Sequence, residues 1–111
     1  MFTGYGADFV SVNGVRYSRA LVVLRDRIVS PWEPESFADI AAVHLASLAG
    51  LGCEIVLLGT GPVQRFPSPQ IIRPLIEARA GIEVMSTPAA CRTYNILVAE
   101  DRKVAAALVL R

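Results

Sequence analysis

The feature that most constrains the fold is a strand–helix–strand pattern between residues 54 and 85. Residues 54–58 form a short apolar run that ends at a Gly-Thr-Gly-Pro turn, residues 59–62, as is typical of a buried parallel strand. A Ser-Pro pair at residues 68–69 then supplies a cap and a first helical position. Residues 82–85 form the next apolar run. A strand, a helix and a second strand at this spacing predict a βαβ unit with a right-handed crossover.

The first third of the chain is predicted to be mainly β structure. Asn13-Gly14 lies between two short apolar runs and favours a type I′ turn, because both central residues of that turn need a positive φ. The second arm of this hairpin is expected to run on through residues 20–24. After a polar break, residues 28–29 start another short strand, which the prolines on either side of Trp32 end.

Two further helices and a last strand are predicted around the βαβ unit. Ser36 is expected to cap the first helix, with Asp39 three residues on in a capping-box arrangement. Thr87-Pro88 is expected to cap and open the third helix, which runs to about residue 99. Residues 104–110 are predicted to form the last strand, although their three alanines would equally suit a helix.

Length and charge narrow the class of protein. The 111 residues are predicted to form one α/β domain, residues 1–111, with a mixed sheet, an N-terminal β-hairpin region and three flanking helices. The 11 basic and 10 acidic side chains leave a net charge of +1, which argues against nucleic-acid binding. The longest apolar stretch, residues 104–110, is far shorter than the roughly 20 residues that span a bilayer. Two cysteines and one histidine predict neither a metal site nor a disulfide framework, and they suit a reducing cytosol.

Gly59-Thr60-Gly61 follows a predicted strand and invites comparison with phosphate-binding loops. The Walker pattern requires a lysine after its second glycine, and Lys103 is the only lysine in the chain. The dinucleotide pattern requires a third glycine that opens a helix, and Pro62 stands close behind instead. We therefore interpret the motif as a tight turn in which glycine permits a positive φ.

Three single residues are interpreted as structural. His44 lies on the apolar face of the first helix with no carboxylate or cysteine at metal-ligand spacing, so it is interpreted as a core or boundary residue. Cys91 is a candidate nucleophile because a helix N-terminus favours a thiolate, but cysteine is also a common small core residue, and we prefer that interpretation. Trp32 is interpreted as a staple over the sheet rather than an exposed anchor.

Arg92, Thr93, Tyr94 and Asn95 bring four polar functions into one turn of the third helix. In one interpretation Arg92 lies in solvent and Asn95 holds a neighbouring loop. In the other, Arg92 lies beside a crevice where residues 59–61 and Thr87 follow two neighbouring strands, because open α/β sheets bind ligands or partners at that edge. Unpaired N–H groups at the helix N-terminus, together with Arg92, would then suit a carboxylate or other planar anion. The residues alone leave both interpretations open.

Residues 85–97 (Met-Ser-Thr-Pro-Ala-Ala-Cys-Arg-Thr-Tyr-Asn-Ile-Leu) resemble a family of small single-domain proteins. That family includes a mitochondrial respiratory complex I assembly factor and the adipogenesis-associated, Mth938-like domain proteins. The resemblance continues through Tyr5-Gly6, Asn13-Gly14, Trp32 and residues 57–61, so it covers nearly the whole chain. It implies a layered α/β domain and, for the mitochondrial members, a non-catalytic assembly role with partner proteins at the inner membrane. No catalytic role is established at family level for the signature positions. By this resemblance, the signature positions of the chain are Gly59, Thr60, Gly61, Arg92, Thr93, Tyr94 and Asn95.

The residues and the resemblance together favour a non-enzymatic adaptor or assembly factor without metal or cofactor. It would recognise a protein segment, including one from a membrane-associated complex, without entering the membrane itself. The predicted binding surface consists of Gly59, Thr60, Gly61, Thr87, Arg92, Thr93, Tyr94 and Asn95. The alternative is a small-molecule or anion-binding domain that uses the crevice between residues 59–61 and the third helix. Because the chain starts directly at the domain, without an Arg-rich presequence, we expect a bacterial cytoplasmic protein.

Overall fold

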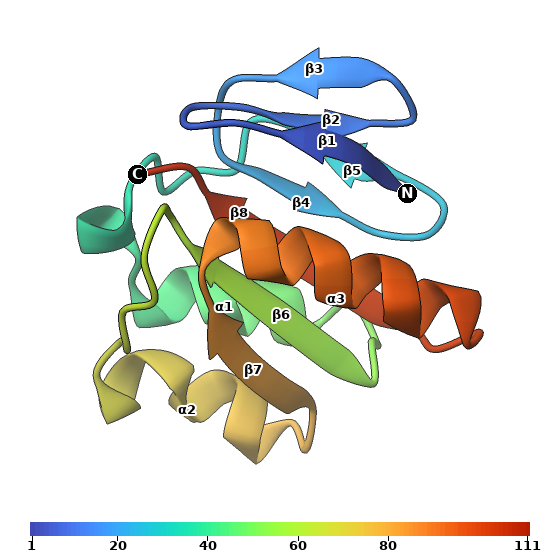
Figure 1. Ribbon diagram of the computed structural model, residues 1–111. Helices are drawn as coiled ribbons and strands as arrows, with labels where there is room; N and C mark the ends of the chain where they lie inside the picture. The colour runs from blue at the N-terminus through green and yellow to red at the C-terminus, as the bar shows by residue number, and fades with distance from the viewer.

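Two β-sheets and three α-helices are packed in layers in the computed structural model, which describes residues 1–111 (Figure 1). The small antiparallel sheet has the order β1-β2-β3, with strands Phe2–Tyr5, Val10–Val12 and Val15–Tyr17. The larger sheet has the order β5-β4-β8-β6-β7, with strands Ile28–Val29, Leu21–Val23, Val104–Val109, Ile55–Thr60 and Gly81–Met85. The helices are α1 (Ala42–Ala49), α2 (Pro69–Glu77) and α3 (Thr87–Ala99), preceded by a single 3₁₀ turn at Phe37–Asp39.

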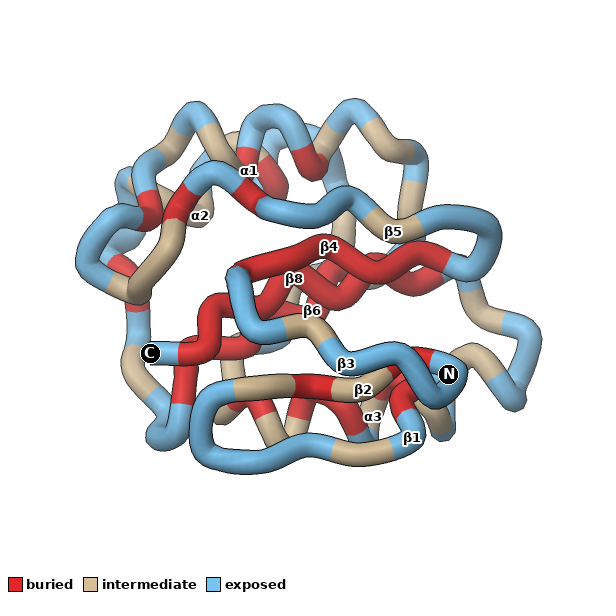
Figure 2. Tube along the Cα trace, turned by 90° about the horizontal axis from the view of Figure 1, so that it is seen from above, coloured by how far each residue is buried: buried red, intermediate tan, exposed pale blue.

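The predicted βαβ unit is confirmed. Strand β6 pairs in parallel with β7, and α2 lies between them in the chain. Pro74 lies inside α2, and Pro69 occupies the first turn, where its missing N–H leaves no intrahelical bond unmade. Helices α1 and α2 cover one face of the large sheet, while α3 and the small sheet cover the other (Figures 1 and 2).

The central strand of the large sheet is β8, which pairs in parallel with β6 and antiparallel with β4. All six of its residues are buried (Figure 2). Alternate side chains face two separate cores, with Ala105, Ala107 and Val109 in one and Val104, Ala106 and Leu108 in the other. A strand buried on both faces needs apolar residues at every position, so the strand prediction for this segment is confirmed.

The hairpin prediction is right at its turn and wrong at its second arm. Asn13 and Gly14 have φ values of 50° and 83°, as a type I′ turn requires. However, β3 ends at Tyr17, and the following segment, β4, pairs with β8 in the other sheet. The reason is burial: all three residues of β4 are buried between β5 and β8 in the large sheet, whereas none of the three residues of β3 is buried.

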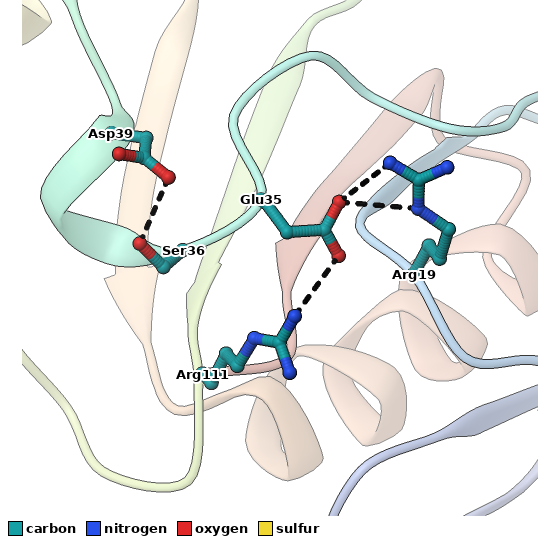
Figure 3. Close-up of polar contacts among 5 residues, drawn as sticks. All are labelled: Arg19, Glu35, Ser36, Asp39 and Arg111. Atoms are coloured by element: carbon teal, nitrogen blue, oxygen red, sulfur yellow. Dashed lines mark hydrogen bonds and ion pairs between the residues drawn. The ribbon is translucent and has the colours of Figure 1, made fainter.

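The start of the first helix is also corrected. Ser36 and Asp39 belong to the 3₁₀ turn, where the Ser36 hydroxyl donates to the Asp39 carboxylate instead of capping backbone N–H groups (Figure 3). Ile40, which is buried, has extended backbone angles that separate this turn from α1. The backbone N–H of Ala41 at the start of α1 is satisfied by the side chain of His44, whose Nδ1 accepts at 2.9 Å.

Trp32 and His44 form one of the apolar contacts beneath α1. Trp32 is buried, which confirms the staple interpretation, and its ring meets the His44 ring edge-on at 6.2 Å between centroids. The His44 side chain is 11% exposed, and its Nε2 lies 3.5 Å from a Glu33 carboxylate oxygen. His44 is therefore a boundary residue, as predicted. None of the helices is both long and apolar enough to cross a bilayer.

His44→Ala is expected to lower the free energy of unfolding by about 1–2 kcal/mol, since the Ala41 N–H loses its acceptor and the contact with Trp32 is lost. Ser36→Ala is expected to change it by less than about 0.5 kcal/mol, because the Ser36 hydroxyl bonds only an exposed carboxylate. Urea denaturation of the two variants measures both values. A larger effect for Ser36→Ala than for His44→Ala would contradict this assignment of the cap.

Candidate functional site

A crevice of about 340 Å³ opens where the strands β6 and β8 end and α3 begins. One part of its wall is formed by Tyr5 at the end of β1 and by Gly6 and Ala7 of the β1–β2 loop. The rest is formed by Gly61, Pro62, Thr87, Pro88 and Leu110. Of the predicted surface residues, only Gly61 and Thr87 lie on its walls. Its position at the carboxyl ends of parallel strands is the edge on which the sequence argument placed a binding site.

The β1–β2 loop was not anticipated as part of the site. Its shape depends on Gly6, because a Cβ there would lie 2.2 Å from the Phe9 ring, and the Gly6 N–H bonds the Phe9 carbonyl. The Arg16 guanidinium stacks on Phe9 at 3.8 Å from the ring centroid. No chemical motif pointed to this loop. The one available signal was the Tyr5-Gly6 pair, which belongs to the family pattern.

The Thr87 hydroxyl connects the elements around the crevice. It accepts a hydrogen bond from the Gly61 N–H at 2.9 Å and donates to the Val109 carbonyl at 2.6 Å. The Thr87 N–H returns a bond to the Gly61 carbonyl at 2.8 Å. Because this hydroxyl is used here, the side chain that caps α3 is that of Ser86, one residue earlier than predicted.

Gly59 permits this connection by lacking a side chain. A Cβ at Gly59 would lie 2.6 Å from a Leu108 methyl carbon and 2.9 Å from the Thr87 hydroxyl oxygen. Any larger residue would push α3 away from the sheet. Gly59 therefore serves packing and does not touch the crevice.

Thr60 organises the loop that follows β6. Its hydroxyl accepts from the Arg65 N–H at 3.0 Å and lies 2.7 Å from the Val63 carbonyl, to which it can donate. The Arg65 guanidinium donates back to the Thr60 carbonyl at 2.7 Å and stacks 4.7 Å from the centre of the Phe37 ring. The tight-turn interpretation is right only for Gly61, which has a φ of 94°, because Gly59 and Thr60 are still paired as the last two residues of β6.

The expectation of free N–H groups at the start of α3 is wrong. The Thr87 N–H bonds Gly61, and Pro88 has no N–H. The N–H groups of Ala89 and Ala90 bond the hydroxyl and the carbonyl of Ser86. The N–H groups of the first turn, at Thr87 and Ala89, are therefore bonded and Pro88 has none, so this turn of α3 offers no free donor to an anion.

Asn95 and Tyr94 attach β1 to α3. The Asn95 side chain bonds both backbone groups of Phe2, accepting from its N–H at 2.9 Å and donating to its carbonyl at 2.8 Å. Tyr94 is buried edge-on against the Phe2 ring, and burial raises the pKa of its hydroxyl. The structural interpretation is therefore right for Asn95, except that it holds a strand and not a loop.

The Arg92 side chain is exposed to solvent, and it also makes one hydrogen bond within the protein. Its guanidinium donates to the Tyr5 hydroxyl at 2.7 Å, so it holds the aromatic ring that lines the crevice. Arg92 itself borders a smaller neighbouring groove of about 190 Å³. Thr93, the remaining predicted residue, is half-buried and lines neither cavity.

Cys91 is a core residue. It is 1% exposed, and burial raises the pKa of its thiol to about 12. A thiol with this pKa is neutral at physiological pH, so the candidate nucleophile has no reactive form there. The side chains do not form any group of three or more histidine, cysteine, aspartate or glutamate residues that could hold a metal ion.

These features define a Mth938-like α/β domain, with a mixed sheet, three helices and an N-terminal antiparallel hairpin. Residues 2–109 match the family described as "Protein of unknown function (DUF498/DUF598)", and the chain belongs to that family. The resemblance inferred from residues 85–97 is thereby confirmed.

Two solved structures are similar over nearly all of the chain. A crystal structure of a Bordetella parapertussis protein matches with a TM-score of 0.92 at 42% identity, covering 99% of this chain and 94% of that one. A solution structure of a Bordetella pertussis protein described as a Mth938-like domain matches with a TM-score of 0.84 at 36% identity, covering 97% and 84%.

The curated relatives are longer proteins. The bovine "NADH dehydrogenase (ubiquinone) 1 alpha subcomplex assembly factor 3" is 33% identical over 107 residues, which are 95% of this chain and 58% of the relative. The "13 kDa major membrane protein" of Francisella tularensis is 33% identical over 75 residues, 68% of this chain and 61% of the relative. The chain thus spans about three fifths of these relatives.

Thr87→Val is expected to lower the free energy of unfolding by about 2–4 kcal/mol, because it leaves the Gly61 N–H and the Val109 carbonyl buried without a partner. Thr93→Val, the same change six residues further along α3, is expected to alter the free energy of unfolding by less than about 0.5 kcal/mol. Urea denaturation measures both. Equal stability of the two variants would show that the hydroxyl bridge does not hold this edge together.

Cys91 is expected to make stability depend on alkaline pH. Its pKa rises from an ordinary 9.0 to about 12 on folding, so its contribution to stability is complete below pH 9 and is lost as the pH rises towards 12. The free energy of unfolding should therefore fall between about pH 9 and pH 12, and fall less in Cys91→Ala. Identical pH profiles for the two proteins would contradict the buried assignment.

Proposed function

We propose that this protein is a non-catalytic adaptor that binds a segment of another protein in the crevice. The observation that carries the proposal is the chemistry of the crevice wall. Its side chains are an aromatic ring, a leucine, an alanine, two prolines and a threonine whose hydroxyl is already bonded. Such a surface fits an apolar peptide side chain and provides no catalytic group.

The relatives support an assembly role. Proteins named as NADH dehydrogenase assembly factors share this domain with the chain, and the name implies work on partner proteins. We extend that role to this protein as binding of a subunit of a larger complex, which includes complexes attached to a membrane. Because the chain spans 58% of the bovine relative, the proposal concerns only the shared domain.

The place of action is part of the same proposal. Two free thiols, Cys53 and Cys91, suit a reducing compartment, and similar structures come from bacteria. We therefore place the protein in the bacterial cytoplasm, as one domain over residues 1–111. The anion-binding alternative loses its main support, since the helix end that would hold the anion has no free donor.

Photo-crosslinking in the native host tests the adaptor function. A photoreactive phenylalanine that replaces Val63, which is 59% exposed and follows Pro62, is expected to form a covalent adduct with a protein partner. The same photoreactive residue in place of Val43, which is 65% exposed on α1, is expected to form no such adduct. Ala7→Phe should fill the crevice and abolish the adduct. Ala78→Phe, an equal change at the exposed end of α2, should leave it intact.

Two outcomes would overturn the proposal. One is capture of the same proteins from Val63 and Val43. The other is an adduct from Val63 that survives Ala7→Phe unchanged while circular dichroism shows that the variant is folded.

A further inference from the structure

We infer that the bound segment has an apolar centre flanked by carboxylate side chains. This inference rests on the proposed function and adds the chemistry of the partner. Its basis is the pair of arginine side chains beside the crevice, Arg65 and Arg92, whose guanidinium groups bond only uncharged oxygens.

Arg92 and Arg65 lie beside the two elements that wall the crevice, and neither forms an ion pair. The Arg92 guanidinium bonds the Tyr5 hydroxyl on the β1–β2 loop. The Arg65 guanidinium bonds the Thr60 carbonyl, and its Nη2 lies 2.9 Å from where a Cβ of Gly61 would be. Five other arginines of the chain are paired with carboxylates, namely Arg19, Arg25, Arg27, Arg102 and Arg111. Both guanidinium groups therefore keep an unneutralised charge.

A second pair of arginines extends the positive rim past Gly61. Glu35 lies between Arg19 and Arg111, at 3.0 Å from the first and 3.7 Å from the second (Figure 3). Two guanidinium groups thus share one carboxylate. The Arg111 backbone lies against Gly61, with its Cα 3.2 Å from where a Cβ would be.

The acidic groups on this side of the molecule do not cancel that charge. Asp39 accepts a hydrogen bond from Ser36 and makes no ion pair (Figure 3). Asp8 is the one carboxylate in the β1–β2 loop, and it is exposed. The two arginines nearest the crevice walls, Arg65 and Arg92, therefore have no acidic partner.

The apolar part of the proposed segment follows from the crevice itself. A volume of about 340 Å³ is at the small end of ligand pockets and accommodates a few side chains of an extended peptide. Two exposed apolar side chains follow Pro62 in the chain, Val63 and Phe66, which are 59% and 74% exposed. The planar guanidinium group of arginine can form two parallel hydrogen bonds with a carboxylate. Acidic residues on either side of the apolar centre would therefore fix the position of the bound segment along the crevice.

Two capped peptides test the inference by NMR titration of the ¹⁵N-labelled protein. Both have a Leu-Pro-Leu centre, flanked on each side by two Glu in one peptide and by two Gln in the other. The Glu peptide is expected to shift the amide signals of Ala7, Gly61 and Leu110 and to bind about tenfold more tightly than the Gln peptide, an advantage that salt removes.

Three variants separate charge from shape. Arg92→Gln is expected to weaken the Glu peptide about threefold, since it removes one of the guanidinium charges. Arg73→Gln, the same change at an unpaired exposed arginine of α2, should have no effect. Tyr5→Phe removes the hydrogen bond to Arg92 but keeps the charge, so it should retain most of the Glu preference.

The results that would overturn the inference are specific. Equal binding of the two peptides, equal effects of Arg92→Gln and Arg73→Gln, or no amide shifts with either peptide would each refute it. Binding to phosphatidylglycerol vesicles without a response to the Glu peptide would also refute it and point to a membrane surface. None of these outcomes refutes the adaptor function, which depends on the separate crosslinking from Val63.

Discussion

The buried hydroxyl of Thr87 is the interaction on which this edge of the molecule depends. It belongs to the first turn of α3, and it bonds the backbone after β6 and the backbone at the end of β8. Gly59 lets α3 come close enough for these bonds to form. Because a buried donor or acceptor without a partner is strongly unfavourable, the three elements are held in one arrangement. The crevice between them is therefore a preformed feature of the fold.

This dependence explains why the residues that match the family pattern have structural roles in the fold and are not reactive groups. Gly59, Thr60 and Thr87 shape the turn after β6, while Tyr94 and Asn95 attach β1 to α3. The other residues that line the crevice lie beside them, among them Gly6 and Ala7 of the β1–β2 loop and Pro62 after β6. A shared scaffold with variable loops is how one fold takes on different partners, so family membership alone leaves the partner open.

The turn prediction held because its local pattern has a single physical solution: few residues tolerate the two successive positive φ values that Asn13-Gly14 adopts. The prediction of β8 also held, although its three alanines left a helix open until the structure buried all six residues of the strand. The predictions that failed concern side chains with competing partners. Ser36 has the composition of a helix cap, yet its hydroxyl bonds Asp39, and His44 satisfies the first backbone N–H instead. Thr87 likewise resembled a cap and became a bridge.

The sequence by itself determined the order of strands and helices, the βαβ unit and the edge of the sheet at which the crevice opens. These follow from periodicity, turn residues and chain connectivity, which act over a few residues at a time. Only the tertiary structure decided which groups are free at that edge. In the folded chain, the N–H groups of the first turn of α3 are bonded within the protein, and Cys91 is buried. Tyr5 and Arg92, which are 87 positions apart in the sequence, are joined by a hydrogen bond. A hydrogen-bonding group has a limited number of partners, and which one it takes depends on distances that exist only in the folded chain.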